Sequence, residues 1–265
     1  AGAAAMRLRA VEMGAAEMGA GAVRPLVLLH GLFGSAANFG AVQKRLAARG
    51  RTIALDLRNH GGSPHAAAMD YAAMAADVLE TLDALGALPA MLVGHSMGGK
   101  VAMAAALEAP AQVARLVVAD IAPVAYPPRL RGYVAAMAAI PLHPGLTRAQ
   151  ADTALAGAVA EPGVRGFLLQ NLRLGPQPAW RIGLAEIARA MPVIEGWETP
   201  AGASYPGPAL FVAGGRSDYI LPEHRPAIRA LFPAARFVTL KQAGHWLHAD
   251  DPDGFLTVLE AMRAA

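Results

Sequence analysis

Apolar residues form two kinds of pattern between residues 25 and 120. Short, largely apolar runs, which are typical of strands buried on both faces of a sheet, occur at 25–30, 52–57, 90–93 and 115–119. Helical periodicity follows each of the first three runs, because apolar residues recur at every third or fourth position. The predicted helices are 38–49, with Asn38 as its N-cap and Gly50 as its stop; 70–85, which ends at Gly86; and 101–108, which Pro110 closes.

This alternation of strand and helix predicts a parallel sheet with helices on both faces and right-handed crossovers. Ligands of such sheets bind beyond the carboxyl ends of the strands. Polar residues stand at the end of all four runs. They are His30, Arg58, Ser96 and Asp120. We therefore expect the functional site at this edge of the sheet.

The pattern changes on either side of this unit. Two modest strands are expected at 6–13 and 15–20. Residues 122–207 are rich in Pro and Gly, lack a strong strand pattern, and contain short helical segments at 128–140, 147–160, 163–171 and 181–190. The sheet pattern then resumes, with strands at 209–213 and 235–240 and helices at 222–232 and 252–263. We predict a core domain of residues 1–121 and 208–265 and a helical cap of residues 122–207, inserted after the sixth strand.

Composition narrows the function classes. The 265 residues are 55% hydrophobic and 16% charged, carry a net charge of +3 and include no cysteine. No apolar run approaches the length of about 18 residues that suggests a membrane span, and Lys and Arg are scattered, which disfavours nucleic acid. Without cysteine there is no disulfide and no thiolate metal site. We expect a cytoplasmic monomer or homodimer without metal or cofactor.

The chemistry centres on Gly94, Ser96 and Gly98, which form a Gly-x-Ser-x-Gly motif between a predicted strand and a predicted helix. This context is that of a nucleophile elbow, where a sharp turn lifts a serine above the sheet. The first amides of the following helix lack intrahelical partners and can bind a developing negative charge. Ser96 is the only one of five serines in such a motif, so we identify it as the candidate nucleophile.

A serine hydroxyl needs a base, and the base needs an orienting acid. His245 follows the last predicted strand, which fits the chain order Ser, Asp, His, and it is the candidate base. The acid has two candidates that the residues alone do not separate: Asp120, directly after the strand at 115–119, and Asp218, in the glycine-rich turn after residue 213.

The oxyanion hole requires two backbone N–H groups. We assign one to Met97, which follows the nucleophile, and the other to Leu32 in the glycine-containing loop 30–34. His95 and Lys100 are interpreted as supports of the elbow. His245 and His248 are three residues apart, but a zinc site there is disfavoured because no third ligand is near in the sequence.

Five sequence blocks resemble the α/β-hydrolase superfamily, and in particular its YbfF-type serine esterases. The blocks are His-Gly-Leu-Phe-Gly-Ser (30–35), Asp-Leu-Arg-Asn-His-Gly (56–61), Gly-His-Ser-Met-Gly-Gly-Lys (94–100), Asp-Ile-Ala-Pro-Val (120–124) and Gly-His-Trp-Leu-His-Ala (244–249). The resemblance implies the α/β-hydrolase fold with a helical cap, and a Ser96–His245 pair. It favours Asp120 as the acid, although this chain also carries Asp218, where the wider superfamily usually places its acid.

The expected function is hydrolysis of carboxylic esters or thioesters of small acyl substrates through an acyl-enzyme. The same residues are also compatible with three alternative functions: a cofactor-free perhydrolase, a carbon–carbon bond hydrolase, or a small-molecule receptor without catalysis. Substrate contacts are expected from residues of the loops around the elbow and from aromatic residues of the cap: His30, Phe33, Tyr126, Phe167, Trp180 and Trp246.

Overall fold

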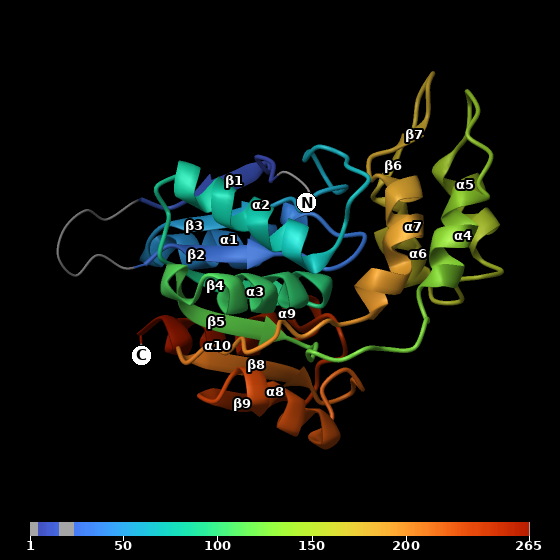
Figure 1. Ribbon diagram of the computed structural model, residues 1–265. Helices are drawn as coiled ribbons and strands as arrows, with labels where there is room; N and C mark the ends of the chain where they lie inside the picture. Colours follow the sequence, from blue (N-terminus) through green and yellow to red (C-terminus); the bar gives the residue numbers. More distant parts are fainter. Residues whose placement is uncertain (1–4, 16–23, 265) are drawn as a thin grey trace.

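The computed structural model describes residues 5–15 and 24–264, which form a seven-stranded sheet flanked by helices (Figure 1). The order of the strands across the sheet is β1-β3-β2-β4-β5-β8-β9. Edge strand β1 is antiparallel to β3, and the other pairs are parallel. The bounds are β1 Ala10–Met13, β2 Leu26–Leu29, β3 Thr52–Leu55, β4 Ala90–His95, β5 Val113–Ala119, β8 Ala209–Gly214 and β9 Ala235–Leu240.

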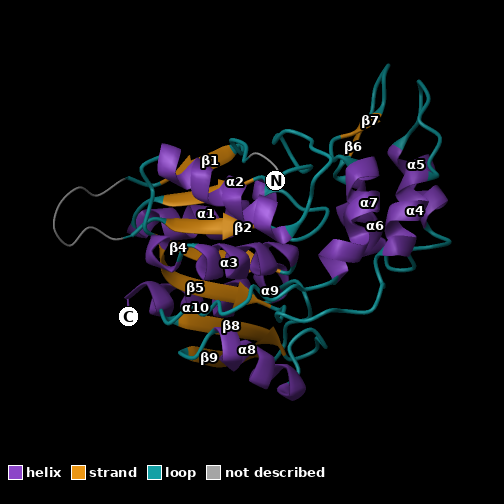
Figure 2. Cartoon of the chain, in the orientation of Figure 1, coloured by secondary structure: helices purple, strands orange, loops and turns teal. Residues whose placement is uncertain are grey.

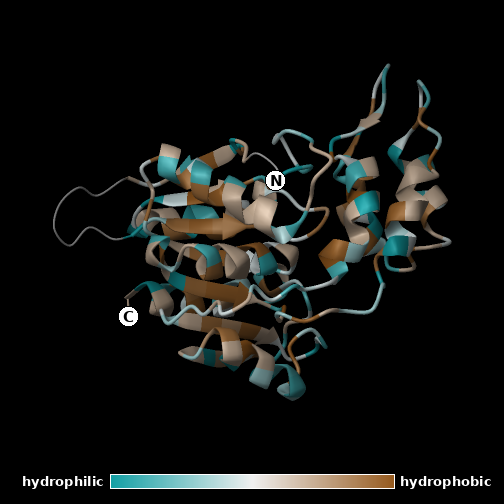
Figure 3. Ribbon diagram, in the orientation of Figure 1, coloured by the Kyte–Doolittle hydropathy of each residue, from teal (hydrophilic) through white to brown (hydrophobic). Residues whose placement is uncertain are grey.

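Both faces of the sheet are covered because its central strands are apolar on both sides. In β2, Val27 and Leu29 belong to one hydrophobic cluster and Leu26 and Leu28 to the other. The first cluster includes α2 (Tyr71–Ala84), α3 (Met97–Glu108) and α8 (Arg225–Leu231), and the second includes α1 (Gly40–Leu46) and α10 (Pro252–Ala264). Figure 3 shows these strands as the most hydrophobic part of the chain. The predicted parallel sheet with helices on both faces is confirmed.

A helical segment connects β5 to β8 and stands beyond the carboxyl ends of the strands (Figure 2). Its elements are α4 Arg131–Ala138, α5 Arg148–Leu155, α6 Pro162–Leu169, β6 Leu172–Arg173, β7 Ala179–Trp180 and α7 Leu184–Glu195. The β6–β7 hairpin pairs two residues on each side, too few to give a strand pattern in the sequence. Among the described residues, no helix combines the length and apolar character needed to cross a membrane.

Local details differ from the sequence predictions. Asn38 is not an N-cap: a 3-10 turn starts at Ala36, and the Asn38 side chain accepts a hydrogen bond of 2.6 Å from the Ser35 N–H. Asn38 therefore stabilises this turn as one of its own residues, and Ser35 is the residue at its N-cap. A short helix, α9 (Leu247–Asp250), lies between His245 and the last predicted helix, where no element is predicted. The strand predicted at 15–20 lies almost wholly outside the described residues, so the helical segment follows the fifth described strand.

Candidate active site

The turn between β4 and α3 holds Ser96 in a strained backbone conformation. Its φ is +53° and its ψ is −120°, which non-glycine residues seldom adopt. A Cβ on Gly94 would collide with the Gly98 carbonyl, and one on Gly98 would collide with the carbonyl of Leu29 on the neighbouring strand. Glycine is therefore required at both positions. The strand ends at His95 and the helix begins at Met97, so the chain turns at Ser96 and leaves it partly exposed between buried neighbours.

Three side chains from distant parts of the sequence meet at this turn. His245 Nε2 lies 3.0 Å from Ser96 Oγ, and His245 Nδ1 lies 2.8 Å from Asp120 Oδ2. The Asp120 side chain is fully buried and accepts a second hydrogen bond of 2.9 Å from the Gly214 N–H. An ionised carboxylate at this position favours the N–H of His245 on Nδ1, so that Nε2 is free to accept the serine proton.

Asp218 takes a different place. It is 54% exposed and forms an ion pair of 2.7 Å with Arg129. The hydrogen bond from Arg129 lowers the pKa of Asp218. Its neighbour in sequence, Ser217, instead donates a hydrogen bond from Oγ to Asp120 Oδ2. Of the two candidate acids, the structure brings Asp120 into contact with His245 and pairs Asp218 with an arginine at the surface.

Two contacts to His245 have no clear sequence signal. The Tyr219 ring stacks on the imidazole, with centroids 4.1 Å apart and an angle of 23° between the planes. His95 Nε2 lies 2.7 Å from the His245 carbonyl oxygen, so it carries the proton and donates. Burial lowers the pKa of His95 well below its ordinary value, which keeps this ring neutral. These contacts and the Ser217 hydrogen bond hold His245 and Asp120 in place.

The loop after β2 places Leu32 beside the serine. Phe33 has a φ of +63°, and its N–H donates to His60 Nε2 at 3.1 Å. The Asn171 side chain donates to the Phe33 carbonyl at 2.8 Å. His30 Nε2 accepts from the Leu57 N–H at 2.9 Å. Buried imidazoles therefore fix this loop, and with it the predicted oxyanion-hole residue Leu32, against the loop that follows β3.

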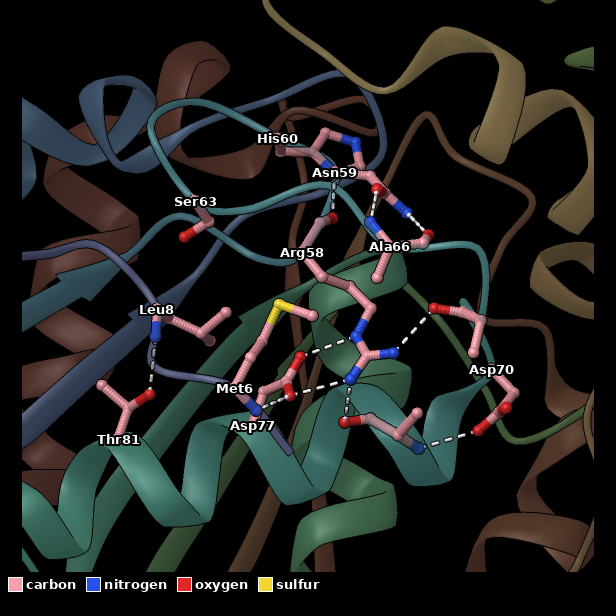
Figure 4. Close-up of polar contacts among 12 residues, drawn as sticks. Met6, Leu8, Arg58, Asn59, His60, Ser63, Ala66, Asp70, Asp77 and Thr81 are labelled. Carbon is pink, nitrogen blue, oxygen red and sulfur yellow. Dashed lines mark hydrogen bonds and ion pairs between the residues drawn. The ribbon is translucent and has the colours of Figure 1, made fainter. Parts of the chain in front are cut away.

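That second loop is itself fixed by a buried ion pair (Figure 4). Arg58 and Asp77 are both fully buried, and two guanidinium nitrogens lie 2.6 Å and 2.8 Å from the carboxylate. The remaining donors of Arg58 reach the carbonyls of Ala68 and Ala73. Although Arg58 follows a strand end, its side chain is used entirely within this cluster, and it makes no contact with Ser96.

A cavity of about 210 Å³ opens onto Ser96 and His245. Its walls are mostly apolar and come from the loop after β2, from the loop around His245 and from helices α4 and α6. Four of the predicted substrate contacts line it, namely His30, Phe33, Phe167 and Trp246. The other lining residues include Leu32, Leu130, Tyr133, Val164, Leu168, Tyr219 and His248.

The two remaining predicted contacts lie elsewhere. Tyr126 lines a second, smaller cavity of about 50 Å³, which also reaches Ser96. Trp180 is in neither cavity. It is half-buried in the β6–β7 hairpin, opposite Leu172, and packs on the main hydrophobic cluster. Neither cavity therefore supports the predicted substrate contact of Trp180, which stays a prediction, and the packing of this residue on the hydrophobic cluster holds the hairpin.

Comparison with known proteins places this geometry in a family. Residues 26–258 match the model of the alpha/beta hydrolase family. The sn-1-specific diacylglycerol lipase ABHD11 of Mus musculus is 42% identical over 248 residues, which cover 90% of this chain and 80% of the relative. Esterase YbfF of Escherichia coli (strain K12) is 40% identical over 237 residues, 89% of this chain and 91% of the relative.

A solved structure described as a marine microorganism esterase has a TM-score of 0.91 at 34% identity. The superposition covers 97% of this chain and all of that one. These similarities confirm the resemblance to YbfF-type esterases that the five sequence blocks indicate. The chain belongs to the alpha/beta hydrolase family.

Proposed function

We propose that this protein is a serine ester hydrolase that uses Ser96, His245 and Asp120. The observation that carries the proposal is the position of His245, whose two ring nitrogens contact the Ser96 hydroxyl and the buried Asp120 carboxylate. The activities named for its relatives, an esterase and a diacylglycerol lipase, support the same reaction class.

In this mechanism Ser96 Oγ attacks the acyl carbonyl while His245 Nε2 takes its proton. The carbonyl oxygen becomes an oxyanion, which the backbone N–H groups of Leu32 and Met97 stabilise. The tetrahedral intermediate collapses, and the alcohol or thiol leaves with the proton from His245. Water then attacks the acyl-enzyme in the same way, which releases the acid and restores Ser96.

We further propose that residues 122–207 act as a cap domain over a core of residues 1–121 and 208–265. Residues of α4 and α6 line the larger cavity. Such a lining suits the hydrocarbon chain of an acyl group, because burial of apolar surface is favourable. The expectations of a cytoplasmic location and of a monomer or homodimer stay predictions.

Replacement of the nucleophile tests the proposal. Ser96→Ala should lower kcat on p-nitrophenyl butanoate by about 10⁶-fold, the scale measured when a triad serine is removed. A fluorophosphonate probe should label Ser96 in the unmodified protein, as peptide mass spectrometry would show. Ser204→Ala, at an exposed serine of the loop before β8, serves as the control and should keep full activity. Labelling at another residue would contradict the assignment.

A further inference from the structure

The C-terminal end of α7 is bound to the core directly beside the elbow. Helices end in carbonyl groups without intrahelical partners, which attract donors and cations. The Tyr71 hydroxyl donates to Ile194 O at 2.6 Å, and Lys100 Nζ, one turn after Ser96 on α3, donates to Gly196 O at 2.6 Å and to Glu195 O at 3.4 Å. These bonds fix the position of Glu195 relative to the nucleophile.

Only one of the two carboxylate oxygens of Glu195 has a hydrogen-bond partner among the described residues. Its Oε2 is bound by Arg131 at 2.7 Å, and the side chain is 9% exposed. Its Oε1 is buried and has no hydrogen-bond partner among the described residues. Buried polar atoms nearly always have a partner, because an unsatisfied acceptor costs the full desolvation penalty. A buried carboxylate oxygen without a donor therefore points to a ligand that brings one.

Glu195 is also one of the residues that line the second cavity. This cavity is lined by Ser96, Met97, Tyr71, Lys100, Tyr126 and Glu195, among others. It shares Ser96, Leu32, Leu130 and Tyr219 with the larger cavity, so the two cavities meet at the nucleophile. Since the larger apolar cavity suits the acyl chain, the smaller one is left for the other side of the scissile bond. Its volume of about 50 Å³ admits only a short group.

The charges around this cavity select a neutral donor. Lys100 and Arg129 line it, and Arg131 holds the outer oxygen of Glu195. Burial lowers the pKa of Lys100 to about 7, so this cavity disfavours an ammonium group, whereas the free oxygen of Glu195 would repel a carboxylate or a phosphate. A hydroxyl group is neutral and donates one hydrogen bond to a carboxylate oxygen.

We propose that the second cavity is a subsite for the alcohol portion of the ester, in which Glu195 Oε1 accepts a hydrogen bond from a hydroxyl group of the substrate. The preferred substrates are then esters of diols or polyols that keep a free hydroxyl. Lys100 and Tyr71 are positioning residues, since they hold the end of α7 and do not themselves bind the hydroxyl. This inference rests on the proposed ester hydrolysis.

Matched alcohol groups test the subsite. Hydroxyalkyl butanoates with two, three and four carbons in the alcohol are compared with methoxyalkyl butanoates of the same lengths, which resemble them in electron withdrawal but donate no hydrogen bond. We expect kcat/KM to be at least about tenfold higher for the hydroxyalkyl ester at one or more lengths, as for a hydrogen bond to a charged group. A ratio below about two at every length would overturn the subsite.

Substitution of the acceptor sharpens the test. In Glu195→Gln, Arg131 holds the amide oxygen, so the NH₂ group takes the place of Oε1 and offers a donor. The ratio of kcat/KM between hydroxyalkyl and methoxyalkyl esters should fall by about tenfold. Glu186→Gln is the matched control, because Glu186 also lies on α7 and pairs with an arginine at 2.9 Å, but lines neither cavity. It should leave the ratio unchanged.

The outcomes separate the two proposals. If none of these esters is cleaved in a Ser96-dependent reaction, the proposed hydrolysis itself fails. If both ester series are cleaved by the unmodified protein at equal rates, the hydrolase stands and the subsite is wrong. If Glu195→Gln keeps the hydroxyl preference, another residue binds the hydroxyl and the assignment to Glu195 is overturned. If this variant does not fold, the subsite is tested by the unmodified protein alone, through its ratio of kcat/KM between hydroxyalkyl and methoxyalkyl esters.

Discussion

The edge of the sheet and the helical segment above it differ in how closely their residues are packed. At the sheet edge, β4 and β5 are paired in register up to His95 and Ala119, and the next residues, Ser96 and Asp120, both have a φ of +53°. The Asp120 N–H also donates to Val212 O of β8 at 2.8 Å. Backbone hydrogen bonds between three strands thus set the relative positions of Ser96 and Asp120, the proposed nucleophile and acid.

The helical segment is attached to the core at several separate points. Its helices pack on one another and reach the core through the end of α7 and through single side chains such as Asn171. A Cβ added to Gly132, Gly157, Gly163 or Gly166 would meet no atom within 4 Å, whereas one on Gly94 collides with backbone. In the proposed mechanism, the sheet edge therefore sets the reaction geometry and the helical segment shapes the space for substrate.

The largest effect expected within this comparison is on kcat, and it distinguishes the two candidate acids, Asp120 and Asp218. Asp120→Asn should lower kcat by about 10⁴-fold, the scale seen when a triad acid is made neutral, because the amide no longer favours the productive tautomer of His245. Asp218→Asn also removes a negative charge, but the Asp218 side chain is 54% exposed at the surface. This substitution should change kcat less than threefold, since surface ion pairs contribute little, about 0–1 kcal/mol. Steady-state kinetics on p-nitrophenyl butanoate measures both, and the reverse order would contradict the assignment of the acid.

Two glycine substitutions should have opposite signs in the two regions. Gly94→Ala should lower the free energy of unfolding by about 3 kcal/mol, because its Cβ meets the Gly98 carbonyl and backbone must shift. Gly166→Ala, within α6, should raise it by about 0.5–1 kcal/mol, because alanine restricts the unfolded chain and fits a helix. Urea unfolding at constant pH measures both changes. Equal effects would show that the two regions are packed alike.

Buried histidines should make the sheet edge sensitive to acid. Burial lowers the pKa of His248 from 6.5 to about 4. The unfolded chain therefore binds this proton first, and stability is lost as the pH falls from about 6.5 to about 4. Between pH 7 and pH 5 His248 should account for a loss of about 2 kcal/mol.

His248→Phe should remove this part of the pH dependence and keep the ring packing on Phe39, whose centroid lies 4.8 Å away. Urea titrations at pH 5 and pH 7 measure the change. His143→Phe, at an exposed position of the helical segment, is the control, and its pH dependence should equal that of the unmodified protein. An unchanged pH dependence in His248→Phe would contradict the role of burial.

The smallest expected effect on kcat/KM concerns selectivity. Phe167 of α6 lines the larger cavity and lies 5.9 Å from the Trp246 ring. Phe167→Ala should lengthen the cavity and raise kcat/KM for octanoate relative to butanoate esters by about tenfold, the scale of a few methylene contacts. Trp180→Ala should leave this ratio unchanged and lower stability instead. If both variants shift the ratio equally, the helical segment determines selectivity by its overall position.

Much of the fold could be predicted because its signals are local. Apolar runs with helices between them depend on neighbours in the sequence, and the elbow around Ser96 occupies five consecutive residues. The pairing of His245 with an aspartate is not local. Asp120 and Asp218 each follow a sheet strand, and only the order of the strands and the direction of each side chain decide which carboxylate lies against the imidazole.

The substrate contacts were the least predictable part. Trp180 and Phe167 are both aromatic residues of short helical or hairpin segments, yet one fastens a hairpin and the other lines a cavity. Ser217 and Tyr219, which contact Asp120 and His245, belong to a turn with no motif of their own. Their positions depend on how the loop after β8 packs against the loop after β5.

The sequence by itself determined the parallel sheet and the elbow, and it singled out the proposed serine and histidine, because strand burial and a sharp glycine turn are properties of short stretches of chain. The tertiary structure decided the contact of His245 with Asp120, the cavity walls and the buried oxygen of Glu195. These depend on contacts between residues up to about 150 positions apart, which strand order and the packing of helices and loops bring together.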